Sequence, residues 1–387
     1  MLELPPWPQP ITLTGAETEI LRYVRQNPGK SRTEIASALQ MSKAMLTKAT
    51  GKFDAIGLVV ERQDAAGEER ERGPRPSRIT LAKDAFHTVG VYLDTSRSAV
   101  VRSDITGNVK KTQTNSADAW CEDLIRVILA DIGAAIAGSP APLLGIGIAV
   151  PGIVAEDGDL FDVAPSQRSL PLRQIAVDIF ETFKLPVYWD SGAHCVAYYE
   201  AHRPLASSEC LFHLTMDYGV GGGLVWKGQL FRGASNQAAN FGALVPETGP
   251  RPSLVDLARH LDVPLEDLTL GRIEELWIDG HVGLRDWTTE RGKGLSLPLS
   301  AVVQLFNPDT ILIGGFFPRP ILEALMHQID LGALDIPSRR PVAKPAMRLT
   351  ELVGATGRAQ AASLLPIAAR LLGQKAVSPP IGRAQII

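Results

Sequence analysis

Residues Leu211 to Ala243 read LFHLTMDYGVGGGLVWKGQLFRGASNQAANFGA, and further strands and helices are predicted on either side of this stretch. An apolar segment at its start is followed by the glycine-rich run 219–223 and then by a second apolar segment, Leu224–Trp226. This order predicts two strands joined by a glycine turn. Because glycine has no side chain and tolerates positive φ, such a turn also lets a ligand approach the backbone closely. A phosphate cradle is therefore one interpretation of the run, and a tight turn without a ligand is the one we favour.

The segments before this stretch predict the strands and helices of one lobe. Leu143–Val150 is apolar without interruption, which is typical of a strand covered on both faces. A short strand, Val187–Trp189, ends at Asp190, and a helix is expected to follow it over Gly192–Ala201. The other elements expected here are strands over Thr88–Leu93 and Ala99–Asp104 and helices over Ala119–Ala137 and Leu172–Phe183.

The segments after the stretch predict a second lobe. An apolar helix over Leu295–Phe306 is followed by the strand Thr310–Ile313, a turn at Gly314-Gly315 and a long helix over Gly354–Leu372. Strands, hairpins and helices thus follow one another twice along the chain. This arrangement predicts an α/β body of two lobes with a cleft between them.

Residues 1–82 have a different pattern, with three short helices and two strands. Helices are expected over Ala16–Gln26, over residues 32–40 and over residues 43–56, each preceded by a serine or threonine that can cap its first turn. Short strands over residues 57–62 and 77–82 then enclose a polar, arginine-containing tip. Two helices, a tight turn, a third helix and a two-stranded wing predict a winged helix-turn-helix, which places its last helix in the major groove of DNA.

The third helix has the charge that DNA contact requires. Three lysines and no acidic residue lie between Ser42 and Phe53, as expected of a surface that faces phosphates. The residues predicted to contact DNA are Ser42, Lys43, Thr47, Lys48 and Lys52 on this helix and Arg75 in the wing. The alternative is a small helical bundle that only dimerises, with its lysines simply solvated.

Composition limits the remaining functions. The 387 residues carry a net charge of −3, so nucleic-acid affinity must come from a local patch. The three cysteines are far apart, which argues against a structural zinc site or a disulfide framework. Neither a signal peptide nor an apolar run of about 20 residues is visible, so the chain is expected to be cytoplasmic and not embedded in a membrane. No cofactor and no metal are predicted.

Taken together, these motifs resemble the ROK family of repressors, open reading frames and sugar kinases, in its DNA-binding branch. The resemblance rests on GIGIAVPGIV, VYWDSGAHCVAYYE, DYGVGGGLVWKGQLFRGASNQAANFG and NPDTILIGG in the body and on residues 13–61 and the GPRP of the wing. It implies an α/β, actin-like ATPase body over residues 83–387 behind the winged domain, and assembly into homodimers or homotetramers. One lobe would hold residues 86–195 with the C-terminal helix, and the other residues 196–370.

The chain departs from the kinases of that family at the phosphate and sugar positions. Tyr92 stands where the resemblance implies an aspartate, and the glycine pair that follows in those kinases is absent. Side chains at these positions obstruct close backbone approach to a phosphate. Asp190 matches the general base of the kinases, but Trp189 replaces the asparagine before it. Asp190 could act as a base, accept a hydrogen bond from a sugar hydroxyl, or have no ligand role.

The resemblance also implies a glutamate at Asn240 and a histidine at Ala243, the second of which would contact sugar and zinc. Ser253 and Val255 fall where a zinc cysteine and a sugar-binding glutamate belong. The zinc of the family is therefore not expected in this chain. The remaining candidates, His194, His202 and His213, lack metal-ligand spacing and are interpreted as ordinary surface or core histidines.

The sequence thus predicts a transcriptional regulator, most simply a repressor, that binds an operator in double-stranded DNA and responds to a sugar or sugar derivative. The residues expected at its ligand site are Gly152, Ser166, Asp190 and Asn240. One alternative is an ATP-dependent sugar kinase with a DNA-binding head. Another is a regulator that has lost its small-molecule ligand.

Overall fold

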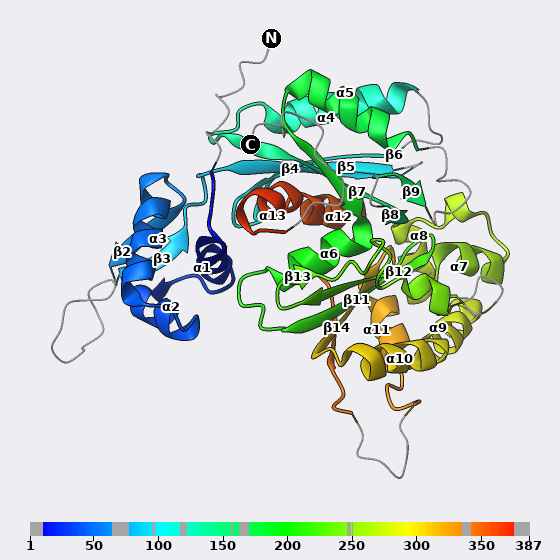
Figure 1. Ribbon diagram of the computed structural model, residues 1–387. Helices are drawn as coiled ribbons and strands as arrows, with labels where there is room; N and C mark the ends of the chain where they lie inside the picture. The colour runs from blue at the N-terminus through cyan, green and yellow to red at the C-terminus, as the bar shows by residue number, and fades with distance from the viewer. Residues whose placement is uncertain are drawn as a thin grey trace.

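The computed structural model describes residues 11–63, 77–94, 97–116, 122–155, 158–161, 170–245, 249, 251–334 and 342–374. A group of N-terminal helices with a small sheet lies beside a larger α/β body (Figure 1). Two five-stranded sheets form the body, with helices between them and on their outer sides. Within the described residues, no helix combines the length and the apolar composition needed to cross a membrane.

The N-terminal group has the three capped helices that the sequence predicts. They are α1 (Gly15–Gln26), α2 (Arg32–Ala38) and α3 (Lys43–Ala55). Thr14 with Glu17 and Ser31 with Glu34 form complete capping boxes, and the Ser42 hydroxyl accepts a hydrogen bond from the Met45 amide. These caps satisfy amides that would otherwise lack a partner at each helix start.

A three-stranded sheet completes this group, in the order β1-β3-β2. Its strands are β1 (Lys30–Ser31), β2 (Val59–Gln63) and β3 (Ser77–Leu81). The predicted wing strands are confirmed, and β1 is an addition that pairs with β3. Ile20, Leu46 and Phe53 are fully buried between helices and sheet, which leaves the opposite face of α3 in solvent.

The first sheet of the body has the order β10-β7-β4-β5-β6. Its strands are β4 (His87–Leu93), β5 (Arg97–Asp104), β6 (Val109–Ser116), β7 (Leu143–Val150) and β10 (Val187–Ser191). Helices α4 (Glu122–Ile136) and α5 (Leu172–Phe183) cover one face, and α12 (Gly354–Ala362) and α13 (Leu365–Leu371) cover the other.

The second sheet has the order β13-β12-β11-β14-β15. Its strands are β11 (Cys210–Met216), β12 (Val220–Trp226), β13 (Gln229–Leu230), β14 (Thr310–Gly315) and β15 (Ala346–Leu349). The helices that follow along the chain are α7 (Leu254–Leu261), α8 (Leu270–Ile278), α9 (Val282–Gly294), α10 (Ser296–Phe306) and α11 (Arg319–His327). A two-stranded ribbon, β8 (Ile153–Val154) with β9 (Leu160–Phe161), follows β7.

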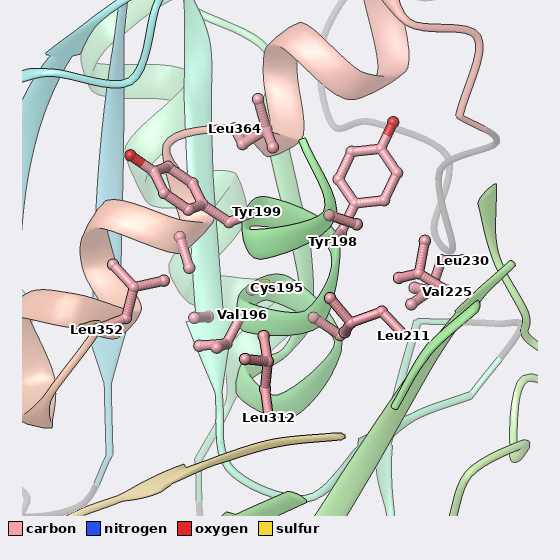
Figure 2. Packing of buried hydrophobic residues seen from close by; sticks show 14 of the residues in the cluster. Cys195, Val196, Tyr198, Tyr199, Leu211, Val225, Leu230, Leu312, Leu352 and Leu364 are labelled. Carbon is pink, nitrogen blue, oxygen red and sulfur yellow. The ribbon is translucent and has the colours of Figure 1, made fainter. Parts of the chain in front are cut away.

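Helix α6 (Gly192–Ala201) is the centre of the body. It packs against β11 and β12 on one side and against α12 on the other, and all ten of its residues are buried. Figure 2 shows its side chains pointing both toward Leu211 and Leu312 of the second sheet and toward Leu352 and Leu364 near the C-terminal helices. A helix that is buried on every side has no solvent-exposed face. The position of α6 is therefore fixed by its contacts with both sheets.

The glycine turn predicted at residues 219–223 is wrong in its placement. The turn is Asp217–Gly219, and Gly221, Gly222 and Gly223 lie inside β12, paired with β11. A Cβ at Gly223 would lie 2.8 Å from the Ala197 Cβ of α6. Glycine is needed in this strand because a helix crosses it closely, and the spacing of glycines alone does not distinguish this from a turn.

Two other predictions near the C-terminus also need correction. The predicted helix 354–372 breaks into α12 and α13, since Pro366 has no amide hydrogen and its ring excludes the carbonyl of Ala362 from a continuous helix. Gly314 and Gly315 end β14 and do not form a turn. A Cβ at Gly315 would lie 1.9 Å from the Met216 carbonyl oxygen, so this glycine serves close packing of β14 on β11.

Candidate functional site

Asp190 lies at the carboxyl end of β10, directly before α6. Asp190 is 1% exposed, and its carboxylate contacts a backbone amide, a histidine ring and a guanidinium group. The Ser191 amide donates to Oδ1 at 2.7 Å, the His194 ring nitrogen Nδ1 lies 3.0 Å from the same oxygen, and Arg232 Nη2 donates to Oδ2 at 2.7 Å. Both carboxylate oxygens are therefore occupied.

These contacts decide the protonation state of Asp190. Burial alone would raise the pKa of the carboxyl, but the charge of Arg232 and the contacts with His194 outweigh it and hold the pKa well below its usual range. A carboxylate that is stabilised this strongly is a poor acceptor for a proton from a sugar hydroxyl at neutral pH. The geometry disfavours the general-base interpretation of Asp190.

Arg232 is a residue of this site that the sequence prediction missed. It follows β13 and also donates from Nη1 to the Asn236 side-chain oxygen at 2.8 Å, while the Asn236 amide donates to the Val154 carbonyl oxygen. The loop after β13 is thereby fastened across the ends of β10 and β8. Arg232 is 42 positions from Asp190 along the chain, and no local pattern indicates that the two side chains meet.

Of the other predicted ligand residues, the structure describes Gly152 and Asn240. Ser191 pairs with Val150 of β7, so Gly152, two residues beyond, follows the same sheet edge as Asp190. Gly152 is half-buried and has a φ of 81°. Asn240 is half-buried at the start of the short 3-10 helix η2 (Phe241–Leu244), four residues after Asn236. Ser166 falls outside the described residues.

Large side chains lie along the same strand-end edge as Asp190. Tyr92 of β4 and Asp190 of β10 both pair with Ala149 of β7, and Arg358 links the Tyr92 ring to Asp217 after β11. Tyr92 is buried, donates from its hydroxyl to Asp94 at 3.0 Å and lies 5.8 Å from the ring of Phe316. The guanidinium of Arg358 lies 4.4 Å from the Phe316 ring centre, and that of Arg97 lies 5.1 Å from it. We call these four residues, Tyr92, Arg97, Phe316 and Arg358, the arginine–aromatic cluster.

The arginine–aromatic cluster also holds the turn that was considered as a phosphate cradle. Arg358 donates to the carboxylate of Asp217 and, at 2.9 Å, to the hydroxyl of Thr215. Its other guanidinium nitrogen donates to the Gly354 carbonyl oxygen at 3.1 Å. The Arg358 guanidinium thus binds the polar side chains at this turn. A nucleotide phosphate would need hydrogen-bond donors that are free at this place.

The positions at which the resemblance implies zinc have other roles. The Ser253 hydroxyl caps α7 by accepting from the Asp256 amide at 3.1 Å, and Ala243 is exposed. Across the part of the chain that the structure describes, no group of three or more histidine, cysteine or acidic side chains is placed to hold a metal ion.

The three histidines lie in the interior. His202 and His213 are buried, and burial lowers the pKa of each to about 3, so both are neutral core residues as predicted. His194 is also buried, but its contact with Asp190 makes it part of the ligand-site candidate. Its place in the first turn of α6, directly after the strand end that carries Asp190, could have indicated this contact.

The predicted DNA-binding residues of α3 differ in their contacts with the rest of the protein. Ser42, Lys43, Thr47 and Lys48 are exposed, and among the described contacts neither Lys43 nor Lys48 has an acidic partner. Lys52 is different, because its ammonium lies 2.8 Å from both the Glu17 carboxylate and the Thr12 carbonyl oxygen. Arg75 lies outside the described residues.

Comparison with known proteins shows what this chain is similar to. The sequence pattern of the ROK family matches residues 94–252. The xylose repressor of Caldicellulosiruptor bescii is 26% identical over 349 residues, which cover 80% of this chain and 86% of the repressor. 

Solved structures of the same family share the fold. A ROK family transcriptional regulator, a homologue of the Escherichia coli MLC protein, has a TM-score of 0.60 at 17% identity and covers 92% of this chain and 97% of its own. A ROK family glucokinase from Streptomyces griseus, solved with glucose and AMPPNP, has a TM-score of 0.55 at 21% identity and covers 72% of this chain and 98% of its own. The chain therefore carries a ROK family domain, in the actin-like α/β fold that regulators and kinases of this family share.

Proposed function

We propose that this chain is a sugar-responsive transcriptional repressor. Residues 1–82 form a winged helix-turn-helix domain that binds operator DNA, and residues 83–387 form a two-lobed body that senses a sugar or sugar derivative. The protein acts in the cytoplasm as a homodimer or homotetramer. The observation that carries the proposal is the exposed face of α3, on which Lys43 and Lys48 lie without acidic partners among the described residues.

The geometry of the N-terminal group supports DNA binding. Leu46 and Phe53 turn one side of α3 into the core, so the opposite side, with Ser42, Lys43, Thr47 and Lys48, is available to a phosphate backbone and to base edges. The similar regulator spans 92% of the chain and the glucokinase 72%, a difference close to the length of residues 1–82. The DNA-binding branch of the family is thus the better comparison.

The polar residues around Asp190 support a sugar effector. A carboxylate with an arginine, an asparagine and a histidine nearby provides the hydrogen-bond partners that a polyhydroxylated ligand requires. The Caldicellulosiruptor bescii relative is named a xylose repressor, which makes a pentose or hexose the first class of ligand to examine. Such a ligand would compete with Arg232 for the Asp190 carboxylate.

Phosphoryl transfer is not the function that the geometry favours. The arginine–aromatic cluster occupies the strand ends where the resemblance places nucleotide phosphates, and Arg358 is paired with Asp217 there. Asp190 is held ionised by Arg232 and His194, so it lacks the basicity that a kinase needs. We propose that kinase activity has been lost.

Two measurements on the full-length protein test this proposal. In a selection from a random duplex pool, we expect retention of duplexes with two half-sites related by a two-fold axis, as a symmetric dimer requires. In thermal unfolding, we expect at least one sugar from a panel headed by D-xylose and D-glucose to raise Tm, because a ligand that binds only the folded state stabilises it. Asp190→Ala should abolish that rise.

Each outcome separates the alternatives. Enriched duplexes together with a sugar-dependent Tm support the sugar-responsive repressor. Enriched duplexes with no rise in Tm for any sugar or sugar phosphate would favour a regulator without a small-molecule ligand. Failure to retain any duplex, even at low salt where phosphate contacts are strongest, would contradict the DNA-binding function.

A further inference from the structure

We propose that helix α6 connects the Asp190 site mechanically to the DNA-binding group, through two side chains of α1, Arg25 and Gln26. This inference rests on the proposed function, since it names the route by which a ligand at Asp190 would act on α3. The residues that carry it lie at the two ends of α6 and along its buried length.

The N-terminal end of α6 is part of the candidate ligand site around Asp190. Asp190 immediately precedes the helix, and its Oδ1 accepts from the Ser191 amide and contacts His194 in the first turn. A ligand that takes over the Asp190 carboxylate therefore changes the contacts of the first turn of α6 directly. Arg232, which holds the other carboxylate oxygen, would be released by the same event.

The middle of α6 leaves no room for bending or local repacking. Every residue from Gly192 to Ala201 is buried, and Ala193 and Ala197 lie against Gly223 of β12, where even an added Cβ would be too close. A helix in a close-packed interior moves as a unit when one end is displaced, because there are no voids into which single side chains could shift. A shift at the first turn is thus carried to the last.

The second end of α6 is where α1 is fastened to the body. The Gln26 side-chain amide donates to the Ala201 carbonyl oxygen at 2.8 Å, and Arg25 Nε donates to the His202 carbonyl oxygen at 3.2 Å. The Leu205 amide, just beyond the helix, donates to the Gln26 carbonyl oxygen at 2.7 Å. The last carbonyl groups of α6, which have no partner within the helix, are thus satisfied by α1.

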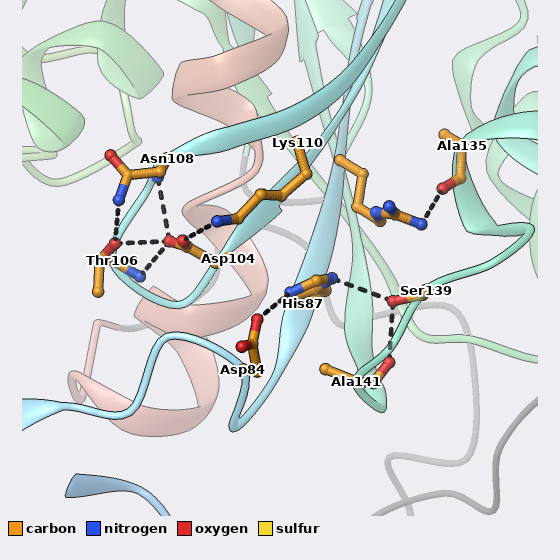
Figure 3. A network of polar contacts seen from close by, with 10 residues as sticks. Asp84, His87, Asp104, Thr106, Asn108, Lys110, Ala135, Ser139 and Ala141 are labelled. Carbon is orange, nitrogen blue, oxygen red and sulfur yellow. Dashed lines mark hydrogen bonds and ion pairs between the residues drawn. The ribbon is translucent and has the colours of Figure 1, made fainter. Parts of the chain in front are cut away.

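Arg25 adds a second anchor on the first sheet. It is 3% exposed, and Nη1 donates to the carbonyl oxygen of Ile105 in the turn between β5 and β6. Figure 3 shows how Asp104 shapes that turn: its carboxylate accepts from the amides of Thr106 and Asn108 and is 3.0 Å from the Lys110 ammonium. A buried guanidinium held by two carbonyl groups is costly to displace unless both move with it.

The contacts therefore form a continuous path from Asp190 through α6 to α1, the first helix of the group that presents α3. Because α1 packs in the same core as α3, with Ile20 and Leu46 both fully buried, a change in the position of α1 reorients the exposed lysines. Coupling between two sites requires only that a ligand at one of them favours one arrangement of the other.

The test compares Asp190→Asn in three backgrounds by its effect on affinity for a selected duplex. In the otherwise unchanged chain, we expect Asp190→Asn to weaken binding about fivefold or more, the lower end of typical coupling between sites. In the Arg25→Lys, Gln26→Ala background, which loosens the fastening of α1, the effect should fall below about twofold. Arg32→Lys is the matched control, since Arg32 pairs with Glu61 inside the N-terminal group and should leave the full effect.

Hydrogen exchange supplies a readout that needs no DNA. We expect Asp190→Asn to speed exchange of the α1 amides while those of α11, on the far side of the second sheet, stay unchanged. Equal effects of Asp190→Asn in all three backgrounds, or unchanged exchange in α1, would overturn the coupling through α6. A chain that binds no duplex but shows faster exchange in α1 would contradict the DNA-binding function and leave the mechanical connection supported.

Discussion

Exchange of Lys43 and Lys48 for glutamate is expected to lower duplex affinity about 100-fold or more at physiological salt, because two cations that release counterions from DNA become anions that repel it. Both residues are exposed on α3, so the fold should be unaffected. The slope of log affinity against log salt concentration should also become shallower by about 2, because two phosphate contacts are lost. Fluorescence anisotropy of a labelled selected duplex over a salt series measures both quantities.

A matched control makes the same change in net charge, but at two lysines of the body. Lys184 and Lys227 are exposed on α5's C-terminal end and on the β12–β13 turn. Their double replacement by glutamate should leave affinity within about twofold, since neither residue lies on the α3 face that is proposed to contact DNA phosphates. Equal losses in both variants would mean that overall charge, and not the α3 face, governs binding.

Replacement of Gly90 by alanine is expected to destabilise the body by about 3 kcal/mol, the upper part of the range for overpacked cores. The added Cβ would lie 1.8 Å from the Ala359 carbonyl oxygen and 2.6 Å from the Ser363 amide nitrogen, so α12 must move away from β4. Urea unfolding followed by tryptophan fluorescence measures the loss as a lower midpoint at an unchanged slope.

Gly271→Ala is the control for this substitution. Gly271 lies in α8 with no atom within 4 Å of an added Cβ, and alanine there should stabilise the helix slightly. If Gly90→Ala unfolds at the same urea concentration as the unchanged chain, α12 does not rest on β4 as described.

Much of the fold follows from local patterns in the sequence. The capping pairs Thr14 with Glu17 and Ser31 with Glu34 fix the starts of α1 and α2, because each cap depends on residues three positions apart. The strand Leu143–Val150 is recognisable because it is apolar on both faces and lies in the interior of its sheet, between β10 and β4. Such features need no knowledge of distant partners.

The glycines show where local patterns fail. Gly223 is required by the passage of α6 over β12, and Gly222 by the close approach of Ala239 and Phe212 on the other face of the strand. These contacts involve residues about 10 to 30 positions away. A glycine that is needed for a turn and one that is needed for packing look the same in sequence. The same reasoning applies to Gly314 and Gly315 at the end of β14.

The candidate site was only partly predictable for a related reason. The motif around Asp190 predicts that residue, but it does not predict Arg232, which pairs with Asp190, or Arg358, which pairs with Asp217. Arginine has a long side chain, so its partner depends on the fold and not on spacing along the chain. Arg25 is a further example, because its partners lie 80 and 177 positions away.

One titration determines whether a sugar sets the affinity of this repressor for DNA. The duplex recovered by selection is titrated with the full-length protein, with and without a saturating concentration of the sugar that raises Tm most. We predict that Kd rises about tenfold or more with the sugar, since a regulatory coupling of 1–3 kcal/mol corresponds to about 5–150-fold, and that Asp190→Ala removes this response. The same Kd with and without every sugar that stabilises the protein would contradict the proposal that a sugar sets this affinity.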